Sequence, residues 1–357
     1  MIRKNFFLNK WCTQLAKLGL VLAIIGPFAA CNGSDEDDLV GDWVKISSFS
    51  GVPRSSAVAA VLDGEAYVGT GYNINTKERL KDFWSYDGTS WSQVAAFGGD
   101  ARTNAVAFTA DGKLYVGTGF NGTNGTKQKD FWAYDPEANT WVEVASLATD
   151  NVNSPELLGR EGMVAFSIND IGYVGTGVDK DGVEYNDFYA YDPSTDSWSQ
   201  ITDFLGEKRQ DAVAFVINNI AYVCTGTNNS SYSSELSSYN PETNAWTRLR
   251  SIEDKSDESY DDDYSIARNQ AVAFTMGGKA YIATGGKNAA GSDVWEYNPS
   301  TDLWTEKTPF EGAARFNAVA FTVGDVGYVL TGQQGSSAYF DDVWTFYPNA
   351  EFDDTTY

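Results

Sequence analysis

The chain has 357 residues, of which 25 are lysine or arginine and 49 are aspartate or glutamate, giving a net charge of −24 at pH 7. It contains no histidine, which excludes Ser-His-Asp and Cys-His nucleophile systems and nearly every catalytic zinc, copper or non-haem iron site. So acidic a surface repels phosphate groups, and nucleic acid is therefore not an expected partner.

Residues 1–30 are predicted to be a signal peptide. They contain an uncharged apolar run of eleven residues, 18–28 (LGLVLAIIGPF), and four basic residues: Arg3, Lys4, Lys10 and Lys17. Eleven apolar residues are too few to span a bilayer but suit a signal-peptide core. Without this segment the chain has 21 basic and 49 acidic residues, a net charge of −28.

The signal ends in Phe28-Ala29-Ala30, directly before Cys31. These four residues resemble the lipobox of bacterial lipoproteins, although phenylalanine replaces the usual leucine. The resemblance implies that Cys31 is lipidated and becomes the first residue of the mature protein. Ordinary secretory cleavage, with Cys31 left free, is the alternative.

Residues 31–41 are expected to be an acidic tether. Residues 32–38 (NGSDEDD) resemble the surface-export signal of one large group of Gram-negative bacteria. That resemblance implies an outer-membrane lipoprotein exposed on the cell surface, held to the membrane only through its lipid. A solvated spacer and a periplasm-facing protein are the alternatives.

From residue 42 onward, three signatures recur six times each. The first is a strand with a tryptophan: Trp43, Trp91, Trp141, Trp198, Trp246 and Trp304. The second is an apolar strand that ends in Thr-Gly and carries a tyrosine: Tyr67, Tyr115, Tyr173, Tyr222, Tyr281 and Tyr328. The third is an acid that opens an aromatic strand: Asp82, Asp130, Asp187, Glu235, Asp293 and Asp342. The tryptophans recur about every 52 residues, which favours a repeat architecture.

Each unit is predicted to form four short strands. The first strand follows an arginine, as in residues 102–108 (RTNAVAF). A two-residue turn joins the first strand to the second, and its composition is the one that positive-φ hairpins require: Asp63-Gly64, Asp111-Gly112, Asn218-Asn219 and Gly277-Gly278. The last aromatic strand, 342–347, has no tryptophan strand after it, whereas Trp43 belongs to a strand with no unit before it. The two fragments complete one another, so residues 42–348 are predicted to form a closed all-β ring of six four-stranded blades, followed by a tail, 349–357.

These repeats resemble the kelch and galactose-oxidase-type β-propellers over residues 42–348. Most kelch units carry Gly-Gly where this chain has Thr-Gly, with Thr284-Gly285-Gly286 nearest the usual form. Copper oxidation of the galactose-oxidase type is excluded because its histidine ligands have no counterpart. The nearest enzymatic family is N-acetylneuraminate epimerase, a sialic acid mutarotase. A resemblance to it implies an acid and a base around the anomeric oxygen and an arginine for the substrate carboxylate. Glu161, Asp211 and Arg160 are candidates for these roles, but no catalytic residue of that family is matched.

An arginine opens the first strand of every unit: Arg54, Arg102, Arg160, Arg209, Arg268 and Arg315. The topology puts these arginines around one mouth of the central channel, near the six repeated acids. We expect a structural arginine ring whose ion pairs hold neighbouring blades together; an anion-binding ring is the alternative.

Function is expected where the sixfold pattern breaks. Two positions after each arginine, on the same side of the strand, the residues differ, and the loops of that face differ too. The candidate ligand-binding residues are Glu161, Asp211, Gln270, Asn104, Asn317, Tyr185, Tyr232 and Tyr339. Aromatic and amide side chains around a polar mouth suit a glycan or a peptide; ordinary loop residues without a ligand are the alternative.

Two connections on that face, 149–159 and 253–265, are longer than their counterparts. The second is acidic but lacks the spacing of a calcium loop, so a solvated loop is preferred over a calcium site, and no metal or cofactor is predicted. Cys224, inside an apolar strand, is expected to be a core residue.

The sequence favours a monomeric recognition module for a glycan or an envelope protein. A carbohydrate mutarotase and an envelope scaffold are the alternatives, and the fold alone decides between none of them.

Overall fold

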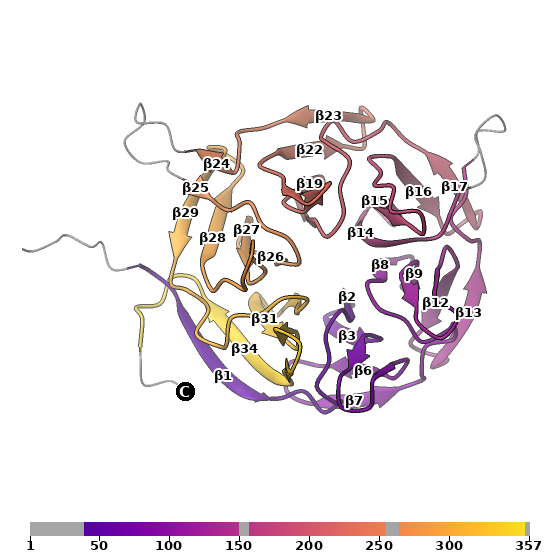
Figure 1. Ribbon diagram of the computed structural model, residues 1–357, viewed down its shortest axis with the longest axis horizontal. Coiled ribbons are helices and arrows are strands. Elements are labelled where there is room, and N and C mark those ends of the chain that lie inside the picture. Colours follow the sequence, from indigo (N-terminus) through magenta and orange to yellow (C-terminus); the bar gives the residue numbers. More distant parts are fainter. Residues whose placement is uncertain (1–38, 150–156, 255–263, 354–357) are drawn as a thin grey trace, which may run out of the picture. The chain divides into compact units, whose positions relative to one another are not determined.

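The outer strand of the last blade comes from the other end of the chain, and this arrangement closes a ring. In the computed structural model, which describes residues 39–149, 157–254 and 264–353, residue 42 begins the strand β1 (Asp42–Ser48). β1 pairs antiparallel with β34 (Asp342–Tyr347), with Asp42 opposite Tyr347 and Ser48 opposite Asp342. Figure 1 shows the two strands side by side at the rim of the ring, coloured indigo and yellow.

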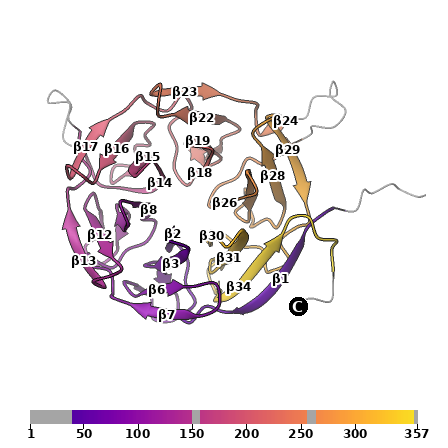
Figure 2. The same ribbon diagram turned by 180° about the vertical axis from the view of Figure 1, so that it is seen from behind.

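Six four-stranded sheets surround a central channel (Figures 1 and 2). Their innermost strands are β2 (Val58–Leu62), β8 (Val106–Ala110), β14 (Arg160–Ile168), β18 (Val213–Ile217), β26 (Val272–Met276) and β30 (Val319–Val323). The second strands are β3 (Glu65–Gly69), β9 (Lys113–Gly117), β15 (Ile171–Asp179), β19 (Ile220–Cys224), β27 (Lys279–Ala283) and β31 (Val326–Leu330). No helix occurs in the described part of the chain, and therefore none that could cross a membrane.

The third strands are β6 (Phe83–Tyr86), β12 (Phe131–Asp135), β16 (Phe188–Asp192), β22 (Leu236–Asn240), β28 (Val294–Asn298) and β34. The outermost are β7 (Trp91–Val94), β13 (Thr140–Val144), β17 (Ser197–Gln200), β23 (Ala245–Arg248), β29 (Leu303–Lys307) and β1. The prediction of a six-bladed β-propeller of four-stranded blades, closed by the N-terminal strand, is confirmed.

Short two-stranded ribbons project where the second strand of a blade leads to the third. They are β4 (Tyr72–Asn73) with β5 (Glu78–Arg79), β10 (Phe120–Asn121) with β11 (Thr126–Lys127), β20 (Thr227–Asn228) with β21 (Ser231–Tyr232), and β32 (Gln333–Gln334) with β33 (Ala338–Tyr339). A fifth ribbon, β24 (Glu253–Asp254) with β25 (Tyr264–Ser265), belongs to the connection between the fourth and fifth blades.

The turns between first and second strands have the predicted left-handed backbone. Asp111 and Gly112 have φ of 46° and 67°, and Asn218 and Asn219 have φ of 51° and 60°. Positive φ at both central residues is the geometry of a type I′ hairpin, which matches the twist of the paired strands.

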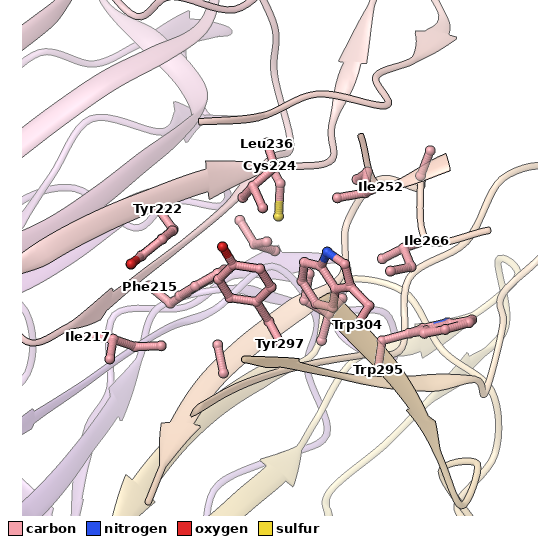
Figure 3. Packing of buried hydrophobic residues seen from close by; sticks show 14 residues of the cluster. Phe215, Ile217, Tyr222, Cys224, Leu236, Ile252, Ile266, Trp295, Tyr297 and Trp304 are labelled. Atoms are coloured by element: carbon pink, nitrogen blue, oxygen red, sulfur yellow. The ribbon is translucent and has the colours of Figure 1, made fainter. Parts of the chain in front are cut away.

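The core consists of apolar and aromatic layers between adjacent blades. Figure 3 shows the layer between the fourth and fifth blades, in which Tyr222, Cys224 and Trp304 are buried. Cys224 is free and fully buried, which confirms its prediction as a core residue. Tryptophans of the outer strands also reach the preceding blade, as where Trp198 Nε1 donates to the carbonyl of Ala145 at 2.8 Å.

Candidate functional site

The six arginines are buried beneath one mouth of the channel, each with at most 3% of its surface exposed. Each forms an ion pair with the acid that opens the third strand of the same blade. Arg54, Arg102 and Arg315 bind Asp82, Asp130 and Asp342 through two hydrogen bonds each, with distances of 2.6–2.9 Å. Arg160 binds Asp187, Arg209 binds Glu235 and Arg268 binds Asp293.

The expectation that these pairs join neighbouring blades is wrong. Arg102 and Asp130, for example, precede β8 and β12, which are strands of one sheet. The guanidinium also donates to the carbonyl of the Thr-Gly threonine, as from Arg102 to Thr118 at 3.0 Å. The pair therefore fastens three strands of its own blade.

Neighbouring blades are joined instead through the backbone of the arginines. The amide of the Thr-Gly glycine donates to the arginine carbonyl of the next blade, at 2.7–2.9 Å in all six cases. At Gly119, a Cβ would lie 2.6 Å from the carbonyl oxygen of Thr103, so this close approach requires glycine.

Two residues after each arginine, the chain takes a left-handed turn. The first strand of each blade, which was expected directly after the arginine, begins only beyond this turn. The third blade is the exception, because β14 starts at Arg160. The six turn residues are Ser56, Asn104, Gly162, Asp211, Gln270 and Asn317, with φ between 53° and 63°. Each amide donates to the carbonyl of its counterpart in the preceding blade at 2.9–3.3 Å, and the six bonds close a circle. We call these six residues the mouth ring.

The mouth ring lines a cavity of about 110 Å³ together with Ala57, Ala105, Met163, Ala212, Ala271 and Ala318. Deeper in the channel the walls are alanine and valine, as at Val106, Val213 and Val319. Amide and carboxylate side chains therefore lie at the mouth, whereas the cavity farther along the innermost strands is lined by apolar residues and by the threonines Thr275 and Thr322.

Four of the predicted ligand-binding side chains form two hydrogen-bonded pairs there. Asn104 Nδ2 donates to Glu161 Oε2 at 2.9 Å, and Gln270 Nε2 donates to Asp211 Oδ2 at 3.3 Å. Lys127 Nζ lies 3.1 Å from Glu161 Oε1. Asn317 belongs to the same ring, and its backbone amide donates to the backbone carbonyl of Gln270.

Asp211 is the titratable group that the mouth perturbs most clearly. Burial raises the pKa of Asp211 to about 6; the hydrogen bond from Gln270 opposes this rise, and the nearby charges of Glu161 and Glu184 add to it. A carboxyl group with this pKa exchanges protons near neutral pH, as a general acid or base requires.

The three predicted tyrosines lie in the ribbons and loops above the mouth, and none of them belongs to the mouth ring. The ring of Tyr185 lies 3.6 Å from the Arg160 guanidinium carbon, and its hydroxyl donates to Asp179 at 2.7 Å. The Tyr232 hydroxyl donates to the carbonyl of Lys287 in the next blade. Tyr339 packs against Tyr72, with ring centroids 6.1 Å apart. These contacts support the loops of the mouth.

Arg160, proposed to hold a substrate carboxylate, has 1% of its surface exposed and already binds Asp187 and the carbonyl of Thr176. The structure contradicts that role because the guanidinium faces the blade interior.

Glu184 was missed by sequence reasoning. It is 8% exposed and accepts hydrogen bonds from Gln210 Nε2 and the amide of Asn229. In the sequence, only the irregular loop of the third blade indicated that this region differs from the other blades.

Some predictions fall outside the described residues. These include lipidation of Cys31, the acidic segment 32–38 and most carboxylates of the 253–265 loop. Within the described ranges, no group of three acidic or cysteine side chains is placed so that it could hold a metal ion.

Among solved structures, the chain is similar to the one titled "Structure of YjhT", with a TM-score of 0.67 and 18% identity, covering 83% of this chain and 95% of that one. It is one of 777 solved chains that match, so this likeness shows the fold and singles out no function. No curated protein matches. The family model of the Attractin/LZTR1 β-propeller matches residues 66–344, and the chain therefore belongs to this kelch-type propeller family.

Proposed function

We propose that the protein is a lipid-anchored recognition module that binds a glycan at the mouth of its propeller. One observation carries this proposal: the mouth ring repeats a single backbone conformation six times with five different residue types. A ring that served only to close the propeller would gain nothing from this variety. Unlike side chains around a small polar cavity are what a site for one particular ligand requires.

The chemistry of the lining favours a glycan over a protein partner or an envelope scaffold. Asn104, Gln270 and Asn317 offer amides, and Asp211 offers a carboxylate, within a cavity of about 110 Å³. Amides and carboxylates pair with the hydroxyl groups of a sugar ring. A cavity of this size accepts one small unit rather than an extended protein surface.

A mutarotase is the second candidate, and the pKa of Asp211, raised to about 6 by burial, favours it. Mutarotation needs a group that both takes up and releases a proton near neutral pH. However, Arg160 and its five counterparts are occupied by carboxylates of their own blades, so they do not offer a cation to sialic acid.

The test is a glycan array followed by calorimetry with the best ligand. Gln270→Ala and Asp211→Asn should weaken binding at least about tenfold, because each removes a hydrogen bond partner in the mouth. Gln93→Ala, on the exposed face of β7, is the matched control and should bind like the wild type.

Sialic acid anomer exchange, followed by NMR on the same variants, tests the second candidate. Exchange accelerated by the wild type and lost in Asp211→Asn would favour the enzyme. Capture of an envelope protein by the wild type, without any glycan bound, would favour the scaffold.

The proposal includes anchoring through Cys31 and export to the cell surface. Cys31→Ser should move the protein out of the membrane fraction and abolish acyl labelling. Replacing residues 35–38 with alanine should leave acylation intact and reduce cleavage by protease added to whole cells. Membrane retention of Cys31→Ser would contradict the anchor, and unchanged cleavage would contradict the export signal alone.

A further inference from the structure

Gly162 is the one member of the mouth ring without a side chain, and its backbone does not explain why. Its φ is 63°, a left-handed value that glycine tolerates best. Yet Ser56, Asn104 and Asp211 adopt φ of 53–55° at the equivalent positions of other blades. Since the same turn is built five times with a side chain, the third blade does not need glycine for its conformation.

The missing side chain makes room for the Asp211 carboxylate. A Cβ placed on Gly162 would lie 2.7 Å from Asp211 Oδ1 and 3.3 Å from the Asp211 amide nitrogen. Asp211 therefore extends over the glycine, toward the third blade. A carboxylate is the far end of a side chain and can rotate away, so a residue larger than glycine would displace it without unfolding the blade.

The charges on this side of the mouth are predominantly negative. The charges of Glu161 and Glu184 act on Asp211, and Lys127 is the cation that acts on it. Lys127 is already engaged by Glu161 and by the carbonyl of Asp179. The arginines below are each neutralised by an acid. An anionic ligand would therefore meet repulsion here, whereas a group that donates hydrogen bonds would meet acceptors.

We propose that Gly162 determines the specificity of the mouth: the space left by its missing side chain lets the Asp211 carboxylate lie over the third blade, where it accepts a hydrogen bond from a donating group of a saccharide. The saccharide is neutral or carries an amine, and acidic sugars are rejected. This inference rests on the proposed function of the mouth and adds to it the ligand class and the residue that selects it.

The experiment compares Gly162→Ser with Gly112→Ser. Gly112 has nearly the same φ, 67°, and a Cβ there would contact nothing within 4 Å, so it controls for the cost of serine in a left-handed turn. The probes are glucosamine, N-acetylglucosamine and N-acetylneuraminic acid, titrated by calorimetry and NMR at pH 7.5. Thermal melts establish that both variants are folded.

The wild type should bind glucosamine most tightly, because its ammonium group donates hydrogen bonds and carries a positive charge, and N-acetylneuraminic acid least. Gly162→Ser should weaken glucosamine binding at least about tenfold, while Gly112→Ser binds like the wild type. Gly162→Ser binding glucosamine as tightly as Gly112→Ser would overturn the role of Gly162 while the proposed function stands. Preference for N-acetylneuraminic acid would overturn the ligand class. A wild type that binds no saccharide would overturn both proposals.

Discussion

Two sixfold rings lie one above the other at the same mouth of the propeller, and they use repetition differently. The arginine ring repeats a side chain: the same guanidinium meets an acid in each blade, with little surface exposed. The mouth ring repeats a backbone: the same left-handed turn and circle of hydrogen bonds carry serine, asparagine, glycine, aspartate and glutamine. Repeated side chains serve the architecture, whereas a repeated backbone leaves the side chains free to differ, as the proposed ligand site requires.

The pKa of Asp130, which pairs with the arginine ring, and the pKa of Asp211, in the mouth ring, shift in opposite directions. Burial by itself raises the pKa of Asp130, but the hydrogen bonds and charge of Arg102 outweigh it, and the net pKa is lowered. In Asp211 no arginine opposes burial, and the pKa is raised to about 6. The charged form of the carboxylate thus stabilises the fold in the first ring and destabilises it in the second.

The largest effect is expected from removing one arginine. Arg102→Ala should lower the free energy of unfolding by about 3–5 kcal/mol, since Asp130 would remain largely buried without its cation and the carbonyl of Thr118 would lose a donor. Urea unfolding at pH 7.5 measures the loss.

Arg209→Ala provides the comparison within the same ring. Its partner Glu235 also binds Arg248, so this loss should be smaller than that of Arg102→Ala. If Arg102→Ala were as stable as the wild type but lost its ligand, the roles of the two rings would be reversed.

A smaller effect of opposite sign is expected from Asp211→Asn. The folded pKa of about 6 exceeds the ordinary value of 3.8. Asp211 therefore stabilises the folded state most below pH 3.8, where its carboxyl group is protonated, and this stabilisation is lost as the pH rises through 6. The variant should therefore be more stable than the wild type at pH 7.5, by about 1–3 kcal/mol at most, and lose this advantage near pH 4. Melting temperatures between pH 4 and 8 check it, with Asn317→Ala as a control that should show no such pH dependence. A variant less stable at pH 7.5 than at pH 4, relative to the wild type, would contradict the burial of a charged Asp211.

The features that could be predicted from the sequence are those that recur locally. Trp43 without a preceding unit and Trp344 without a following tryptophan strand were enough to predict how the ring closes. Asp111-Gly112 predicted its turn because the turn chemistry lies in two adjacent residues.

The mouth ring was not predictable in the same way. Nothing in the intrinsic preferences of Ser56 or Gln270 indicates a left-handed turn; the circle of bonds between blades imposes it. The partner of each arginine was also placed wrongly, because sequence spacing brings an acid to the right face but does not say whether it lies in the same blade. Glu184 follows no repeated pattern at all.

The seam between β1 and β34 has a mechanical consequence. Asp42 lies opposite Tyr347, so the segment that enters the propeller and the segment that leaves it meet at the same end of this strand pair. A force that pulls these two segments apart would load the backbone hydrogen bonds one after another, as in a zipper, instead of all at once. The ring closure, which protects the sheet edges at rest, is therefore the place where tension between the two ends would peel the propeller open first.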